Sequence, residues 1–176
     1  MKGKSASPTP TEQYLSFSLN STLQALLSAH QLAEIIRLDP SQIIPISEMP
    51  DSVIGVCPWQ GEVLWLVDLA YLFGFEPLMN SSNIQSYSSI IKARSHRGNL
   101  GLWVAQVGEL ISCEPTTIQS PELSSRQLQS RDNFPTRKES VSAILVHWIQ
   151  GSWVHPDGSI LPILDLEAIQ GYLVQE

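Results

Sequence analysis

Short apolar and alternating runs, separated by turn residues, make up most of this chain. The alternation of polar and apolar side chains over Tyr14–Leu19 predicts a half-buried strand. Comparable runs predict further strands at Val53–Val56, Glu62–Val67, Ser88–Ser95, Leu100–Val107, Ala143–Gln150, Ser152–His155 and Ser159–Leu164. Many short strands with little helix favour a β-barrel or β-sandwich, so we expect a mainly β fold.

Three stretches are less regular. The apolar positions of Leu23–Leu38 fit both the strand and the helix period, and we expect a strand followed by a helical turn. Ile43–Ile46 predicts a strand that stops before Pro50, because a proline ring removes a ladder donor. Gly108 interrupts the last part of a long strand region and predicts a β-bulge there.

One pattern occurs twice along the chain. The stretches WQGEVLWLVDLAYLFG (residues 59–74) and PDGSILPILDLEAIQG (residues 156–171) share a glycine turn, an apolar run, Asp-Leu and a final glycine. We interpret Asp68 and Asp165 as structural caps, each accepting free amide protons at the start of a short helix. Gly74 and Gly171 are expected to end these helices. The repetition predicts two similar lobes.

The same two aspartates allow a catalytic interpretation. Carboxylates from two similar lobes form the active site of aspartic proteases, where they share one proton. Here Asp68 and Asp165 are each followed by leucine and a helix-like pattern, without a Thr-Gly pair. Capping explains this spacing, and we therefore expect no catalytic residues.

Composition suggests how the chain is organised. Residues 1–12 are rich in Ser, Pro and Thr and are expected to be disordered. Residues 13–176 are expected to form one domain whose two barrel lobes are intertwined in sequence. Within it, residues 114–140 are rich in Ser, Pro, Gln, Arg and Glu and predict a long connection.

The charge balance narrows the classes of partner. The chain has 176 residues, a net charge of −7 and only 15% charged residues. A low charged fraction leaves neutral surface for protein partners, while the negative charge opposes binding to nucleic acid and to anionic membranes. No apolar run approaches the length of a membrane span, and MKGKSASPTPTEQ lacks the apolar core of a signal peptide. We expect a cytoplasmic protein without direct membrane insertion.

Candidate chemistry is sparse. Cys57 and Cys113 are not in a CxxC pair and are expected to be small buried residues. The four histidines lack the spacing of a helical metal pair, no serine lies in a G-x-S-x-G turn, and no glycine-rich phosphate loop is present. We expect no metal and no cofactor.

The order of the motifs resembles that of CheW-like domains. Residues 32–74 carry, in sequence, a V-x-E-[IV]-like segment at Leu32–Ile35, a hydrophobic–Pro–hydrophobic stretch at Ile44–Ile46, a glycine turn and Asp-Leu. The stretch GLWVAQVGELISCEPTTIQSP (residues 101–121) resembles a later strand of the family. The likeness covers roughly residues 13–172 and ends with the second copy of the repeat.

This resemblance implies a fold and a role. The implied fold is two five-stranded SH3-like β-barrels packed together, with short helices. The implied role is that of a non-enzymatic adaptor, which joins the cytoplasmic tip of a chemoreceptor to the regulatory domain of a CheA-type histidine kinase. Other CheW-like domains are further expected partners.

The resemblance also implies a partner-binding surface between the barrels. The predicted partner-binding residues are Leu32, Glu34, Ile35, Trp59, Gln60, Val104 and Val107. Gln60 stands where the family usually has arginine, and Gln106 stands where it often has aspartate, so the partner is expected to differ from the usual one. Trp59 is added because large amphipathic side chains in turns suit interface hot spots. For the aliphatic positions, ordinary core packing is the alternative.

The expected function is therefore coupling of chemoreceptor signalling tips to a CheA-type kinase in a chemotaxis, phototaxis or pilus-motility system. A competitor that sequesters the kinase or the receptor through the same surface is one alternative. A small-ligand-binding barrel or a hydrolase is another, and it requires an enclosed polar pocket with convergent titratable groups.

Overall fold

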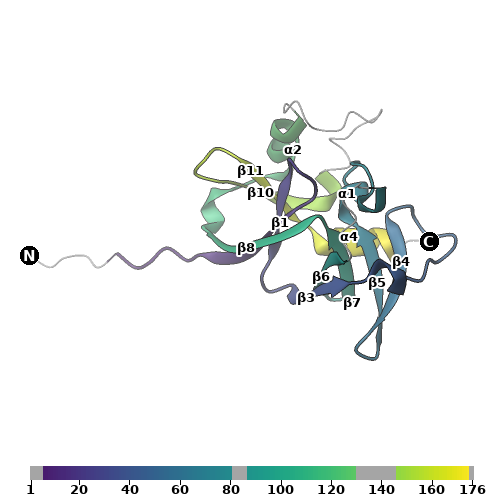
Figure 1. The fold of residues 1–176 in the computed structure, drawn as a ribbon. Helices are drawn as coiled ribbons and strands as arrows, with labels where there is room; N and C mark the ends of the chain where they lie inside the picture. The colour runs from purple at the N-terminus through teal and green to yellow at the C-terminus, as the bar shows by residue number, and fades with distance from the viewer. Residues whose placement is uncertain (1–5, 81–86, 130–145, 175–176) are drawn as a thin grey trace, which may run out of the picture.

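The protein folds into two β-sheets with short helices packed against them (Figure 1). The computed structural model describes residues 6–80, 87–129 and 146–174. Sheet A has the strand order β8 (Gln106–Cys113), β1 (Glu12–Ser18), β2 (Gln24–Ser28), β11 (Ile160–Leu164), β10 (Ile149–Val154) and β9 (Ile118–Gln119). Sheet B has the order β3 (Leu32–Leu38), β6 (Ser88–Ser95), β7 (Gly98–Val104), β5 (Glu62–Asp68) and β4 (Val53–Trp59). The mainly β prediction is confirmed, with β9 as an extra two-residue strand in sheet A.

The two sheets are copies of one arrangement. In sheet B, β5 pairs in parallel with β7, and every other pairing is antiparallel. In sheet A, β11 pairs in parallel with β2, and again the other pairings are antiparallel. Strands β8, β1, β2, β11 and β10 therefore correspond to β3, β6, β7, β5 and β4. Because β1 and β2 come first in the chain, sheet A is a circularly permuted version of sheet B.

In each sheet, a glycine lies where another backbone segment passes close to the strand. The register of β4 shifts at Gly55, and the register of β10 shifts at Gly151. A Cβ atom at Gly55 would lie 2.3 Å from the Ile44 carbonyl oxygen, and one at Gly151 would lie 2.3 Å from the Gln119 carbonyl oxygen. Each glycine therefore allows a backbone segment to cross closely over its strand.

Both predicted helix caps are confirmed. Asp68 accepts a hydrogen bond from the Tyr71 amide at 3.0 Å and begins α1 (Leu69–Leu72). Asp165 accepts one from the Ala168 amide at 3.0 Å and begins α4 (Leu166–Val174). Gly74 follows α1 with a positive φ of 86°, as expected of a helix stop. Gly171 lies inside α4, so its predicted role as a helix stop is wrong.

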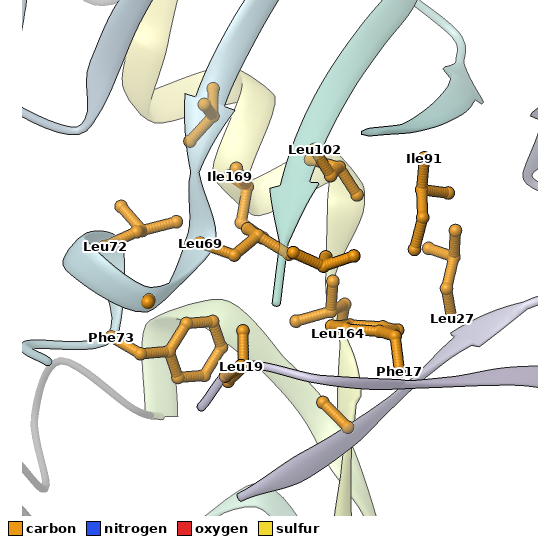
Figure 2. Close-up of a cluster of buried hydrophobic side chains, with 14 of the residues drawn as sticks. Phe17, Leu19, Leu27, Leu69, Leu72, Phe73, Ile91, Leu102, Leu164 and Ile169 are labelled. Atoms are coloured by element: carbon orange, nitrogen blue, oxygen red, sulfur yellow. The ribbon is translucent and has the colours of Figure 1, made fainter. Parts of the chain in front are cut away.

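The main core joins the two sheets. One cluster combines side chains of sheet A, sheet B, α1 and α4, and Figure 2 shows Phe17, Leu102 and Ile169 converging there. A second cluster, with Ile36, Leu64 and Ile90, has its buried members in sheet B. A third, with Tyr14 and Leu161, is formed by sheet A. Each lobe thus has a filled interior, and the first cluster holds the lobes together.

Several element predictions need correction. Leu32–Leu38 is a strand rather than a helical turn, because it pairs along its length with β6. Ile43–Ile46 contributes only one bridge, between Ile44 and Val56. The strand predicted at Leu100–Val107 breaks at Ala105, where the chain leaves sheet B for sheet A. The bulge predicted at Gly108 lies where the β1–β8 register shifts.

The second half of the chain also differs from expectation. The connection predicted at residues 114–140 contains β9 and α2 (Pro121–Gln129), and residues 130–145 lie outside the described ones. Of the strand predicted at Ala143–Gln150, residues 146–148 are helical and β10 begins at Ile149. Disorder of residues 1–12 stays a prediction, since residues 1–5 are not described and β1 begins at Glu12.

Candidate functional site

A polar contact joins the two edge strands of sheet B. Glu34 lies on β3, and Trp59 ends β4 at the opposite edge of the sheet. Trp59 Nε1 donates to Glu34 Oε2 at 3.2 Å, and Gln60 Nε2 donates to Glu34 Oε1 at 3.4 Å. Sheet B therefore curls until its edges meet, and three of the predicted partner-binding residues come together at the junction.

The β4–β5 turn holds Gln60 in an unusual backbone conformation. Gln60 and Gly61 have φ values of 49° and 81°, and Trp59 pairs directly with Glu62. Positive φ at both central residues is the geometry of a two-residue type I′ hairpin turn. The left-handed region is uncommon for a residue other than glycine, asparagine or aspartate. The tight turn thus positions the Gln60 side chain towards Glu34.

A second carboxylate lies on the same hairpin. Glu62 Oε2 accepts from Lys92 Nζ at 3.3 Å and from Asn99 Nδ2 at 3.3 Å. Two hydrogen bonds hold the pKa of Glu62 below its ordinary value, with the bond from Lys92 as the larger cause and that from Asn99 as the smaller. Lys92 is the cross-strand neighbour of Glu34, yet its ammonium group pairs with Glu62.

Apolar side chains extend the main core to the surface on β3, an edge strand of sheet B, and on β8, an edge strand of sheet A. Ile35 on β3 is 47% exposed and lies opposite Ile91, while Leu110 on β8 is 58% exposed and lies opposite Leu15. Directly opposed residues share a sheet face, and both Ile91 and Leu15 belong to the cluster between the lobes. We call Leu32, Ile35, Val107 and Leu110 the apolar strip, since Leu32 and Val107 also pack against that cluster.

The duplication relates the two halves of this strip. Leu32-Ala33-Glu34-Ile35 on β3 corresponds to Val107-Gly108-Glu109-Leu110 on β8. Each segment is followed by an acidic residue, a proline and a short 3-10 helix, at Pro40–Gln42 and Pro115–Thr117. Leu110 was missed in the sequence, although the repeated apolar–small–Glu–apolar motif is the signal that would have found it.

The predicted site residues do not all lie together. Glu34, Trp59 and Gln60 are in contact, and Leu32, Ile35 and Val107 belong to the apolar strip. Val104 is only 1% exposed and packs in the core between the lobes. Core packing, the alternative stated above, accounts for its apolar side chain.

The remaining chemistry-bearing residues have structural environments. Asp68 is 1% exposed, and burial raises its pKa even though backbone amides donate to it. Burial raises the pKa of the Cys113 thiol to about 11, and burial also raises the pKa of the Cys57 thiol. A raised pKa favours the unreactive, protonated form of both thiols.

Within residues 6–80, 87–129 and 146–174, no group of three or more metal-ligating side chains is present. Over the same part of the chain, no helix has the length and apolarity to cross a bilayer.

Two cavities lie away from Glu34. One of about 590 Å³ is lined in part by Leu19, Phe75 and Trp103, and Val104 reaches its wall. The other, of about 320 Å³, lies between the β1–β2 turn and the β10–β11 hairpin. Neither is lined by Glu34, Trp59 or Gln60.

Comparison with known proteins identifies the family. The sequence model of the CheW-like domain matches residues 13–132. Among solved structures, the chain is similar to the scaffolding protein TtCheW from Thermoanaerobacter tengcongensis, with 20% identity, a TM-score of 0.65, and coverage of 89% of this chain and 90% of that one. A search of curated proteins returned no match. At this identity the structural match establishes the fold, and the matched domain establishes that the chain belongs to the CheW-like family.

Proposed function

We propose that this protein is a non-enzymatic adaptor that couples the signalling tips of chemoreceptors to a CheA-type histidine kinase. The observation that carries the proposal is the CheW-like domain over residues 13–132, in a fold shared along nearly the whole chain with a scaffolding protein. The place of action is the cytoplasm, at membrane-associated receptor arrays. Chemotaxis, phototaxis and pilus motility are all outputs that such an adaptor serves.

The interiors of the two lobes favour an adaptor over a ligand-binding barrel. The clusters inside sheet A and sheet B are made of packed apolar side chains. An enzyme of this size needs a concave site with convergent titratable groups. The exposed candidate residues of this chain instead lie on an edge strand, at Ile35, and in a turn, at Gln60.

We assign to partners the edge of β3, which carries part of the apolar strip on one face and the Glu34 contact on the other. Exposed apolar side chains and fixed polar groups are both typical of interaction sites. Ile35 and Leu110 supply apolar area, while Glu34, Trp59 and Gln60 supply directional polar contacts. The receptor tip and the kinase regulatory domain are the proposed occupants of this and neighbouring surfaces.

Reconstitution tests the proposal. The purified protein is mixed with a receptor signalling-tip fragment and the kinase regulatory domain from the same organism, and binding is measured by calorimetry. We expect binding to both partners, and an Ile35→Ser variant that weakens binding about tenfold with only a small loss of melting temperature. A well-folded protein that binds neither partner would contradict the proposal.

Kinase activity separates an adaptor from a competitor. With receptor-containing vesicles and full-length kinase, an adaptor raises receptor-dependent autophosphorylation as its concentration increases. A competitor binds the same partners but lowers that activity. A Val154→Ser variant, which changes an exposed apolar residue at the end of β10, is the matched control for the Ile35→Ser variant.

A further inference from the structure

We infer that the outward face of β4 and β5 is a docking site for an amphipathic helix of a partner protein. This surface is separate from the edge of β3, and the inference does not depend on the proposed adaptor function. It follows from a comparison of the two copies of the fold, because one copy carries a helix at this place and the other does not.

In sheet A, helix α2 covers the outward face of β10 and β11 (Figure 1). Ser152 on β10 alternates with Trp153, which packs inside sheet A, so Ser152 lies on the outward face. Its hydroxyl shares a hydrogen bond of 2.6 Å with that of Ser124 on the helix, and both serines are fully buried. Leu128, one turn further along the helix, packs into the main core. This copy shows how a helix packs on the face.

Sheet B has the equivalent strands without the helix. Strands β4 and β5 correspond to β10 and β11, and the bridge between Ile44 and Val56 corresponds to the pairing of Gln119 with Ser152. After Gln119 the chain forms α2, whereas after Ile44 only residues 45–52 precede β4, and none of them is helical. Among the described residues, no helix packs extensively on β4. The position that α2 occupies in sheet A is therefore uncovered in sheet B.

The uncovered face of sheet B is apolar. Val63 and Trp65 alternate with the buried Leu64 on β5, and their side chains are 67% and 38% exposed. Trp65 lies opposite Val56, which in turn lies opposite Ile44, whose side chain is 54% exposed. Directly opposed residues share a sheet face. We call Ile44, Val56, Val63 and Trp65 the outer patch.

The differences between the two copies define the helix that fits the outer patch. Val56 on β4 stands where β10 has Ser152, which is bound to a helix serine. Trp65 on β5 stands where β11 has Pro162. A helix docked here therefore presents apolar side chains at spacings of three and four residues, including the position at which α2 has Ser124. Tryptophan is a frequent anchor of such contacts.

The neighbouring charges indicate the polar residues of this helix. Residues 45–52, which take the place of the longer connection in sheet A, include Glu48 and Asp51 and contain no lysine or arginine. Both acidic side chains are exposed, and neither forms an ion pair with a described residue. A lysine or arginine at one end of the partner helix complements them. A second copy of this chain is a poorer occupant, because its net charge of −7 opposes self-association.

A designed peptide tests the site on the full-length protein. The probe is a peptide of about 18 residues, since shorter isolated helices are marginal, with leucines at i, i+3, i+4 and i+7 and two lysines at one end. A peptide of the same composition in scrambled order is the control. Binding is followed by the amide resonances of isotope-labelled protein. We expect the helical peptide to bind and to shift the amides of Val56, Val63 and Trp65, and the scrambled peptide not to bind.

Substitutions locate the contact. Threonine keeps the β propensity of the strand, so Val63→Thr and Trp65→Thr should stay folded, and melting curves establish this. We expect Trp65→Thr to weaken peptide binding about tenfold and Val63→Thr several-fold. Ile35→Ser, which changes an exposed apolar residue outside the outer patch, is the matched control and should bind the peptide like wild type.

Several results would overturn the inference. These are no binding at about 1 mM peptide, equal binding of the scrambled peptide, an unaffected Trp65→Thr variant, or an equal loss in Ile35→Ser. A dimer in analytical ultracentrifugation that Trp65→Thr dissociates would also overturn it, because a second copy would then cover the outer patch. None of these results bears on the adaptor function, which is tested by binding to the receptor tip and the kinase.

Discussion

Single residues decide how closely the backbone segments of this fold approach one another. Gly55 and Gly151 lie at matching register shifts, and each faces a carbonyl oxygen of a crossing segment. Gln60 accepts a left-handed conformation so that a two-residue turn can place its amide beside Glu34. The sequence predicts a turn at Gln60, but it does not predict the close approaches at Gly55 and Gly151, because it cannot show which atoms lie opposite them.

Alanine substitutions test the glycine crossings. Gly55→Ala and Gly151→Ala should each lower the free energy of unfolding by about 2 kcal/mol or more, because the new methyl group meets rigid backbone. Gly158→Ala is the control, since its Cβ has nothing within 4 Å and only the positive φ opposes it, at about 1 kcal/mol. Urea denaturation measures all three. Equal losses at the three positions would contradict this explanation.

At the scale of elements, pairing partners override local pattern. Leu32, Ile35 and Ile36 suit a helix as well as a strand, and pairing with β6 decides for strand. The polar sequence of α2 predicts a connection, yet the helix packs on β10 with a hydrogen bond between the Ser124 and Ser152 hydroxyls at 2.6 Å. Such contacts join residues far apart in the sequence, so no local window contains them.

Helix α4 contains a glycine, Gly171, at a position where a residue of higher helix propensity fits. Gly171 lies within the helix, its φ is not in the left-handed region, and a Cβ there has nothing within 4 Å. Gly171→Ala should therefore stabilise the protein by about 0.5–1 kcal/mol, as glycine disfavours helix interiors by that amount. Thermal denaturation measures the gain. A lower melting temperature would indicate that the glycine ends the helix in solution.

The β10–β11 hairpin should show a pH dependence. Hydrogen bonds from the Ser159 side chain and amide lower the pKa of Asp157 to about 2, with His155 as a smaller cause. A depressed folded-state pKa adds stability above the unfolded-state pKa, and this stability is lost as the pH falls towards 2. The difference in melting temperature between wild type and Asp157→Asn should shrink from pH 6 to pH 3. Ser159→Ala should reduce this pH dependence, and a constant difference would contradict it.

At the scale of the whole molecule, the duplication explains which predictions succeeded. The repeated Asp-Leu motif predicted two lobes and two helix caps, and both are present. The contact between Glu34 and Trp59 could not be predicted, because it depends on how far sheet B curls. The burial of Val104 depends likewise on the other lobe, which covers it. Local pattern therefore predicts the elements, while the shape of each lobe determines the site.

Circular permutation tests the proposed relation between the sheets. A chain opened within residues 29–31, with α4 joined to β1 by a linker resembling the α1–β6 connection, would run through sheet B and then sheet A without interleaving. We expect this permutant to reach the same circular dichroism spectrum as wild type, with a modest loss of stability from the opened turn. A second permutant, opened at Ala105 between β7 and β8, is compared with the first. An unfolded first permutant would contradict the assignment of β1–β2 as the closing hairpin of sheet A.

The interleaving also sets an order of events during synthesis. Strands β1 and β2 leave the ribosome first, but their partners β8 and β11 are made much later. All five strands of sheet B are complete by Val104, before β8 exists. Because domains fold as units as the chain emerges, we expect sheet B to form first while the leading hairpin waits, with its apolar face open to chaperones. The nascent chain thus passes through a stage in which one lobe is finished and the other has only its opening hairpin.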